Sequence, residues 1–263
     1  MKLALLSDIH LYRKPQRLRC ALQAAKGAQA LLLAGDLADR AQPEQYGLLL
    51  ECLRELPAGM QICCVSGNHD NPSGDDSAYR DFEKRILPEP AQRHESGALY
   101  ASLSAQADLI GLNPAYHQKE FFFPGRGQQL AFAEERLVAS GARVHLVMCH
   151  PPLIAHNPQR SAGMPPYIVR EQDNRLQRLM DSRRNTLFLS GHTHYPPTVE
   201  WDEARCNLYI NNGSVCPTTI GGDPARLQQG NITLLTLEED RISVEIRGIH
   251  TGVVFHQQEY PLE

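Results

Sequence analysis

Short, uninterrupted apolar runs constrain the fold of this chain more than any other feature of its sequence. Six runs rich in Leu, Ile and Val recur along it, and small or polar residues follow each one. Continuous apolar runs of this length are typical of strands that are buried on both faces of a sheet. We therefore expect strands at Lys2–Leu6, Ala30–Ala34, Gln61–Val65, Val144–Cys149, Thr186–Leu189 and Leu208–Ile210.

Helical spacing between the runs predicts an α/β protein. Pro43 opens one helical stretch at a position where the first turn tolerates proline. Strand-rich sequence after residue 207 predicts a final hairpin, with strands at Ile232–Leu237 and Ile242–Ile246. No repeat or linker divides the sequence, so we expect residues 1–263 to form one α/β domain. The expected helices are Gln16–Gly27, Pro43–Leu56, Asp76–Leu87, Gln128–Ser140 and Asn174–Ser182.

Composition and charge exclude several classes of protein. Hydrophobic residues make up 42% of the chain and charged residues 21%, which is ordinary for a globular protein. The formal net charge of −4 argues against a surface that binds nucleic acid. No apolar run approaches the roughly 20 residues of a membrane span, and the first residues are expected to form a strand, not a signal peptide. The seven cysteines form no C-x-x-C pair, so we expect a reduced, cytoplasmic protein.

Polar side chains of types that commonly bind metal ions follow five of the six runs. Taken singly, each has an ordinary explanation, because Gly-Asp and Gly-Asn pairs form turns and helix caps, and a lone histidine is more often structural. Together they are all metal-ligand types, and the carboxyl ends of parallel strands line one crevice. We therefore expect the following side chains to converge: Asp8 and His10, Asp36, Asn68, His150, and His192 with His194.

The motifs DIH, GDLAD, GNHD, the His before Pro-Pro, and GHTH, in this order, resemble the calcineurin-like metallophosphoesterase family. The resemblance extends from Met1 to about Ser214, including Asn212-Gly213-Ser214, and the combined pattern is similar to class III cyclic-nucleotide phosphodiesterases. It implies a four-layer αββα sandwich, in which helices flank two mixed β-sheets and the metal site lies at the carboxyl ends of the strands.

The resemblance also implies a site for two divalent metal ions. One ion would be held by Asp8, His10, Asp36 and His194, and the other by Asp36, Asn68, His150 and His192, with Asp36 bridging. A shell of nitrogen and oxygen ligands without thiolate suits Mn²⁺, Fe or Zn²⁺.

The expected function is hydrolysis of a phosphoester, in which a metal-bridging hydroxide attacks the phosphorus of a small phosphodiester, for example a cyclic nucleotide. The alternatives are a phosphomonoesterase or nucleotidase on the same site, and a non-catalytic interaction scaffold. A scaffold is expected to have lost ligands, and this sequence keeps all seven.

Three further residues complete the expected site. His69 would give a proton to the leaving alcohol or bind phosphate, and Asp70 would fix the orientation of His69 or raise its pKa. Asp39 would orient a ligand imidazole or cap a helix. Arg13 and Lys14 would clamp a phosphate or belong to a solvated loop.

Two segments, 113–127 and 151–173, lack clear periodicity, so we expect long loops there that are functional or mobile. Phe121–Phe123 inside the first of them would form an exposed lid or a partner surface, or pack in the core, which is the interpretation we favour. Cys149 precedes a candidate ligand in a strand, so it should point away from the metals.

Overall fold

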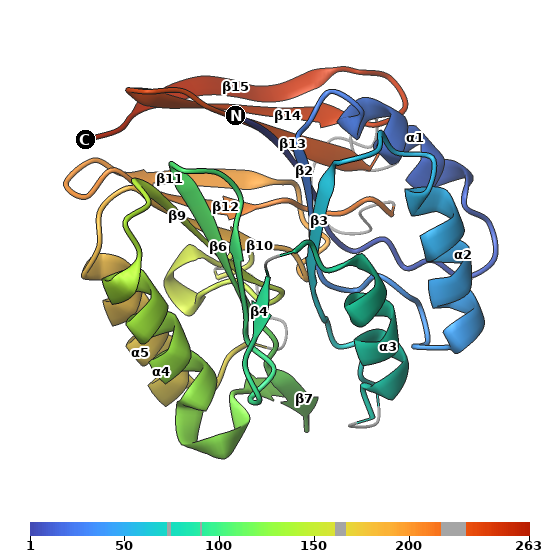
Figure 1. The fold of residues 1–263 in the computed structure, drawn as a ribbon, viewed down its shortest axis with the longest axis horizontal. Helices are drawn as coiled ribbons and strands as arrows, with labels where there is room; N and C mark the ends of the chain where they lie inside the picture. The colour runs from blue at the N-terminus through green and yellow to red at the C-terminus, as the bar shows by residue number, and fades with distance from the viewer. Residues whose placement is uncertain (73–74, 90, 161–166, 217–229) are drawn as a thin grey trace.

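The structure, a computed structural model, describes residues 1–263 apart from 73–74, 90, 161–166 and 217–229. Two large mixed β-sheets form its centre (Figure 1). The strand order in the first sheet is β15-β14-β13-β1-β2-β3, in which β1, β2 and β3 run parallel. Its strands are β1 (Lys2–Leu6), β2 (Ala30–Ala34), β3 (Gln61–Val65), β13 (Asn231–Leu237), β14 (Arg241–Gly248) and β15 (Val254–Pro261).

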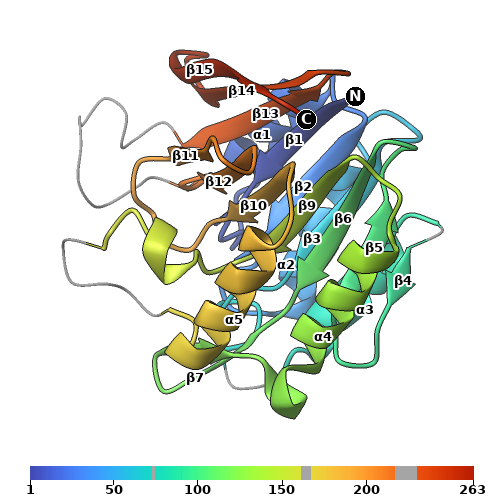
Figure 2. The same ribbon diagram turned by 90° about the vertical axis from the view of Figure 1, so that its left-hand side faces the viewer.

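The second sheet has the order β11-β12-β10-β9-β6-β5-β4, and its four central strands run parallel. Its strands are β4 (Gln92–Arg93), β5 (Leu99–Ser102), β6 (Ala107–Leu112), β9 (Val144–Cys149), β10 (Thr186–Ser190), β11 (Thr198–Asp202) and β12 (Asn207–Asn211). Figure 2 shows the antiparallel strands β13, β14 and β15 continuing the first sheet beyond β1.

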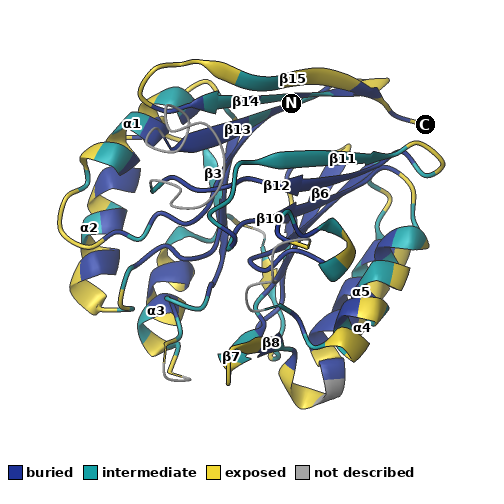
Figure 3. Cartoon of the chain, turned by 180° about the vertical axis from the view of Figure 1, so that it is seen from behind, coloured by how far each residue is buried: buried dark blue, intermediate teal, exposed yellow. Residues whose placement is uncertain are grey.

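Helices cover the outer face of each sheet. On one side lie α1 (Gln16–Ala25), α2 (Pro43–Leu53) and α3 (Ser77–Ile86), and on the other lie α4 (Pro124–Ala139) and α5 (Arg170–Asp181) (Figure 1). The helices turn buried faces toward the sheets and exposed faces outward (Figure 3). The expected four-layer αββα arrangement is therefore confirmed.

Side-chain alternation in the central strands explains why both faces of each sheet are buried. Leu3 and Leu5 of β1 pack between the two sheets, whereas Ala4 and Leu6 pack against the helices. Across the second sheet, Met148 of β9 lies in the core between the sheets, and Cys149 lies in the cluster under α4 and α5. Apolar side chains on both faces require continuous apolar runs, which are the runs that the sequence contains.

The two segments expected to be long loops contain regular structure. A short hairpin forms from β7 (Ala115–His117) and β8 (Glu120–Phe122), and a 3₁₀ turn, η1, spans Ile154–His156. In addition, α4 begins at Pro124 and α5 at Arg170, both about one turn before the expected starts. The start of α4 was missed although proline fits a first helical turn, and β8 was missed because it is only three residues long and buries one fully enclosed side chain, Phe121. Residues 161–166 lie outside the described residues.

No helix among the described parts of the chain has the length and apolar character needed to cross a membrane.

Candidate metal centre

Six of the seven expected ligands converge where the carboxyl ends of the two parallel strand sets meet. Asp8, His10, Asp36 and His194 offer donor atoms that lie within 4.8 Å of one another. Asp36, His150 and His192 form a second group of this kind. Asp36 belongs to both groups, so the sheets bring together two adjacent sets of metal-ligand side chains that share one carboxylate.

Short distances join the members of the first group. His10 Nε2 and His194 Nε2 are 3.0 Å apart. His10 Nε2 lies 3.5 Å from Asp36 Oδ2, and His194 Nε2 lies 3.2 Å from Asp8 Oδ1. Two imidazole nitrogens and two carboxylates therefore face a common point, and a cation placed between them could contact all four.

The second group contains donor atoms that have no hydrogen bond within the described part of the protein. The Nδ1 of His150 donates to the Ala34 carbonyl oxygen at 2.7 Å, so Nε2 is the ring nitrogen left for a metal ion, and this atom lies 3.3 Å from Asp36 Oδ2. Nε2 of His150 and Oδ1 of Asn68 are both buried, and among the described residues neither makes a hydrogen bond. Buried polar atoms are normally hydrogen-bonded, so these two suit metal coordination.

The backbone of the site is strained at most candidate ligands. Non-glycine residues rarely adopt positive φ, and each such residue costs about 1–3 kcal/mol. Five of the seven candidate ligands adopt it, with φ of 52° at Asp8, 43° at His10, 51° at Asp36, 71° at His192 and 52° at His194. Strain of this kind concentrates at functional sites, because the surrounding fold must hold it in place.

Two glycines allow the strand ends to approach one another. A Cβ atom on Gly67 would lie 2.2 Å from Asp36 Oδ1, and one on Gly191 would lie 2.4 Å from Asp8 Oδ2. Either contact is far inside van der Waals distance, so a side chain at these positions would displace a candidate ligand. Gly67 opens the GNHD motif, and it is needed for this close approach and not for a positive φ.

The charges of the site favour cations. Burial raises the pKa of Asp36, but the His150 and His10 rings outweigh burial and hold this pKa far below its usual value. Burial lowers the pKa of His150 and His194, but the neighbouring carboxylates outweigh burial here too. Asp36 raises the pKa of His150 to about 9, and Asp8 raises that of His194 to about 10. The buried carboxylates therefore attract positive charge, which either metal cations or protonated imidazoles can supply.

His69 lies at the edge of the first group. Its backbone N–H donates to Asp36 Oδ1 at 2.8 Å, and its ring lies 4.5 Å from the ring of His10. Nδ1 of His69 is 2.8 Å from the carbonyl oxygen of Asp39 and must donate, because a carbonyl only accepts. The carboxylate of Asp39 is 3.7 Å from Nδ1 of His10, near this imidazole but beyond ordinary hydrogen-bond distance.

The carboxylate of Asp70 bonds partners other than the ring of His69. It is fully buried and accepts hydrogen bonds from the N–H groups of Leu37, Ala38 and Gly67 and from the hydroxyl of Tyr46. Nδ1 of His69 bonds the Asp39 carbonyl oxygen, and among the described residues no hydrogen bond joins Asp70 to this ring. Asp70 instead ties the loop after β2 to the GNHD loop. Burial and the charge of Asp36 raise its pKa to about 6.

Phe121 contacts the candidate centre, which sequence reasoning did not foresee. Its ring is fully buried and lies edge-on to His192 at 5.1 Å between ring centroids, and it lies 6.1 Å from His150. Its backbone pairs with residues 167 and 169, because its N–H donates to the Tyr167 carbonyl oxygen and its carbonyl accepts from Val169 N–H. Phe121 therefore packs in the core, which was the favoured expectation for this segment. No periodic signal in the sequence identifies its contact with the histidines.

Several other histidines, cysteines and basic side chains lie outside the two donor groups. Cys149 points into the cluster under α4 and α5, away from the candidate ligands, as expected. His145 pairs with Asp108 at 2.9 Å in the core. His156 bonds Glu200 at 2.8 Å and stacks on Tyr209. The side chains of Arg13 and Lys14 are exposed.

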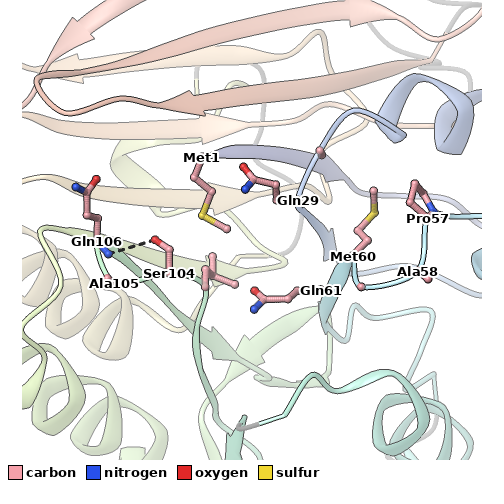
Figure 4. Close-up of a pocket in the computed structure, with 12 residues that line it drawn as sticks. Met1, Gln29, Pro57, Ala58, Met60, Gln61, Ser104, Ala105 and Gln106 are labelled. Carbon is pink, nitrogen blue, oxygen red and sulfur yellow. Dashed lines mark hydrogen bonds between the residues drawn. The ribbon is translucent and has the colours of Figure 1, made fainter.

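A cavity of about 700 Å³ lies at the other ends of the strands. Figure 4 shows Met1, Gln29, Gln61, Ser104 and Gln106 around it, at the beginnings of β1, β2 and β3 and at the turn between β5 and β6. None of the candidate ligands lines it, because they follow the carboxyl ends of the strands. The cavity is therefore separate from the candidate metal centre.

Comparison with known proteins identifies the class of this one. A sequence model described as calcineurin-like phosphoesterase matches residues 1–196. A probable cyclic nucleotide phosphodiesterase of Synechococcus sp. is 26% identical over 207 residues, which are 74% of this chain and 73% of that protein. The fold, the clustered donors and these matches define a metallophosphoesterase, a hydrolase that acts on phosphoester bonds. The chain belongs to the calcineurin-like phosphoesterase family.

Solved structures share the fold at low sequence identity. The purple acid phosphatase from yellow lupin seeds aligns with 98% of this chain at a TM-score of 0.70 and 12% identity. This chain covers 53% of that protein, about half its length. GAP50, the anchor in the inner membrane complex of Plasmodium, aligns with all of this chain and 89% of its own at a TM-score of 0.66 and 14% identity. The shared architecture thus occurs in proteins whose descriptions differ widely.

Proposed function

We propose that this protein hydrolyses a small phosphodiester with the help of two divalent metal ions. The observation that carries the proposal is that Asp36 belongs to both donor groups, since two adjacent cations need an anionic group between them. Asp8, His10, Asp36 and His194 would hold one ion, and Asp36, Asn68, His150 and His192 the other. The donor set of imidazole, carboxylate and amide oxygen, without thiolate, suits Mn²⁺, Fe or Zn²⁺. When bound, such ions act as Lewis acids and supply a nucleophile for attack on phosphorus near neutral pH.

His69 would manage the proton of the leaving group. Its Nδ1–H is engaged by the Asp39 carbonyl, which fixes the ring and leaves Nε2 as the nitrogen that exchanges a proton or binds a phosphoryl oxygen. The hydrogen bond from its N–H to Asp36 ties this ring to the shared carboxylate. Asp70 would act indirectly, because its hydrogen bonds hold together the two loops that carry Asp36 and His69.

The choice of a diester as substrate is supported by the relative described as a cyclic nucleotide phosphodiesterase. Hydrolysis of bis(p-nitrophenyl) phosphate and p-nitrophenyl phosphate by manganese-loaded protein tests this choice. We expect the diester to be preferred, and 3′,5′-cyclic AMP, 2′,3′-cyclic nucleotides and nucleoside monophosphates then define the natural class. A strong preference for monoesters would favour a phosphomonoesterase or nucleotidase, and inactivity on every compound would favour a scaffold.

A variant pair tests the role of His69. His69→Asn should lower kcat on the diester by about 10²–10⁴-fold while the bound metal is retained, because a lost proton donor affects the chemical step. His250→Gln, at an exposed turn after β14, should keep full activity. Unchanged kcat in the His69 variant would remove the assigned role.

A further inference from the structure

An exposed aromatic ring with two arginines lies beside the candidate metal centre. Tyr12 is 42% exposed. The guanidinium carbons of Arg13 and Arg40 lie 4.8 Å and 5.0 Å from the centre of this ring, within the range of cation–π contact. We call Tyr12, Arg13 and Arg40 the rim cluster.

The backbone connects the rim cluster directly to the donor groups. Tyr12 follows the candidate ligand His10 by two residues, and the Asp39 N–H donates to the Leu11 carbonyl oxygen at 3.2 Å. Arg40 lies 3.4 Å from the carboxylate of Asp39, whose other oxygen is 3.7 Å from His10 Nδ1. The rim cluster is therefore linked through Asp39 to the edge of the first donor group.

The rim cluster presents cationic hydrogen-bond donors to solvent. Within the described part of the chain Arg13 has no carboxylate partner, and Arg40 has one, Asp39. A guanidinium offers five N–H donors in a planar fork that matches a carboxylate or phosphate, and stacking on a ring limits the motion of the fork. A merely solvated loop gives no reason for an exposed ring to hold two guanidinium groups over its surface.

We propose that the rim cluster is an anion subsite, which binds a second negatively charged group on the phosphodiester substrate. This inference rests on the proposed function and adds a substrate class to it: diesters that carry a further anionic group, such as a carboxylate, beyond the scissile phosphorus. Arg13 binds the anion, Arg40 supports it electrostatically, and Tyr12 holds the two guanidinium groups in place.

Two matched diesters test this subsite. Each is an aryl p-nitrophenyl phosphate in which the second phenol carries either a meta-carboxylate or its methyl ester, and p-nitrophenolate release gives kcat/KM. The ratio of the two kcat/KM values is compared between wild type and variants, so that differences in intrinsic reactivity cancel. Arg13→Gln should lower this ratio about fivefold, through KM for the carboxylate substrate, and leave the methyl ester unchanged.

Further variants separate charge from structure. Arg13→Lys should restore most of the ratio, and Tyr12→Ala should lower it while Tyr12→Phe preserves it. Arg54→Gln removes an exposed positive charge at the end of α2 and should leave the ratio at the wild-type value. Raising the salt concentration from about 0.05 to about 0.5 M should lower the wild-type ratio toward that of Arg13→Gln, because salt screens exposed charges.

The outcomes distinguish this inference from the proposed function. Equal losses on both diesters in Arg13→Gln, or an unchanged ratio, would overturn the anion subsite while the hydrolysis itself stands. Failure of the wild-type protein to hydrolyse the methyl ester would contradict the proposed function and the subsite together.

Discussion

Replacing Gly67 with alanine should disable the candidate metal centre through its neighbour Asp36. An added Cβ would lie 2.2 Å from Asp36 Oδ1 and 2.5 Å from the Asp36 backbone nitrogen, whereas ordinary contacts begin at 3.4 Å. The GNHD loop and the loop after β2 must therefore separate by about 1 Å. The hydrogen bond from the His69 N–H to Asp36 and those from the Leu37 and Ala38 N–H groups to Asp70 bridge the same gap, so they would lengthen.

The expected magnitudes follow from this displacement. Overpacking of a close contact costs about 1–3 kcal/mol of unfolding free energy. A shift of about 1 Å in a positioned group costs about 10²-fold in rate. Urea unfolding of the metal-free protein measures the first quantity, and hydrolysis of bis(p-nitrophenyl) phosphate at saturating manganese measures the second. The activity loss should exceed the fraction of unfolded protein by a wide margin.

Gly47 provides the matched control. It lies inside α2, and a Cβ there would meet nothing within 4 Å. Gly47→Ala should stabilise the protein by about 0.5–1 kcal/mol, because alanine is the better helix former, and should leave activity unchanged. Wild-type stability and activity in Gly67→Ala would refute the argument that this glycine is required for the approach to Asp36.

Two further predictions concern Asp70 and the pH dependence of metal binding. Tyr46→Phe removes the hydroxyl that donates to Asp70 at 2.8 Å and should cost about 1.5–3 kcal/mol of unfolding free energy. The control, Tyr12→Phe at the surface, should cost less than about 0.5 kcal/mol. Equal costs in the two variants would contradict the role of Asp70 as a tie between loops. Because the pKa of His150 is raised to about 9 and that of His194 to about 10, both rings are protonated in metal-free protein at neutral pH, and a ligand imidazole must lose its proton. Manganese affinity measured by titration calorimetry should therefore rise with pH. At pH values below these pKa values the rise should be about tenfold per pH unit for each proton that metal binding releases. An affinity independent of pH would contradict these protonation states.

The strands with continuous or alternating apolar residues could mostly be predicted from the sequence, and the largely exposed strands β11 and β15 could not. The bounds of β1, β2, β3 and β9 agree with the expectation residue for residue, because strands buried on both faces must be continuously apolar. In contrast, β11 is half-exposed along its whole length, and most of β15 is exposed or half-exposed. Pairing with a neighbouring strand specifies such strands, and their own sequence holds no apolar run. β6 was missed although it is fully buried, because Asp108 and Gly111 interrupt its apolar residues.

The identities of the clustered side chains could also be predicted, but their immediate surroundings could not. Ligand-type residues at strand ends indicate convergence, since the sheet topology places those ends together. The bonds of Asp70 to the loop after β2 depend on which N–H groups that loop directs inward. The contact of Phe121 with His192 depends on a hairpin that the sequence does not signal. Arg40 contacts the ring of Tyr12 although the two residues lie 28 positions apart in different loops, and no local sequence pattern predicts this contact.

The number of metal ions bound by each chain tests the central claim most directly. Purified protein, loaded with Mn²⁺ and freed of excess by gel filtration, should contain about two ions per chain, as expected for a two-metal hydrolase. Asp36→Asn removes the shared carboxylate, so it should bind less than about one ion and lose most diesterase activity, while Asp240→Asn at an exposed turn should match the wild type. Full activity in metal-free protein, or two ions retained by Asp36→Asn, would contradict the proposed centre.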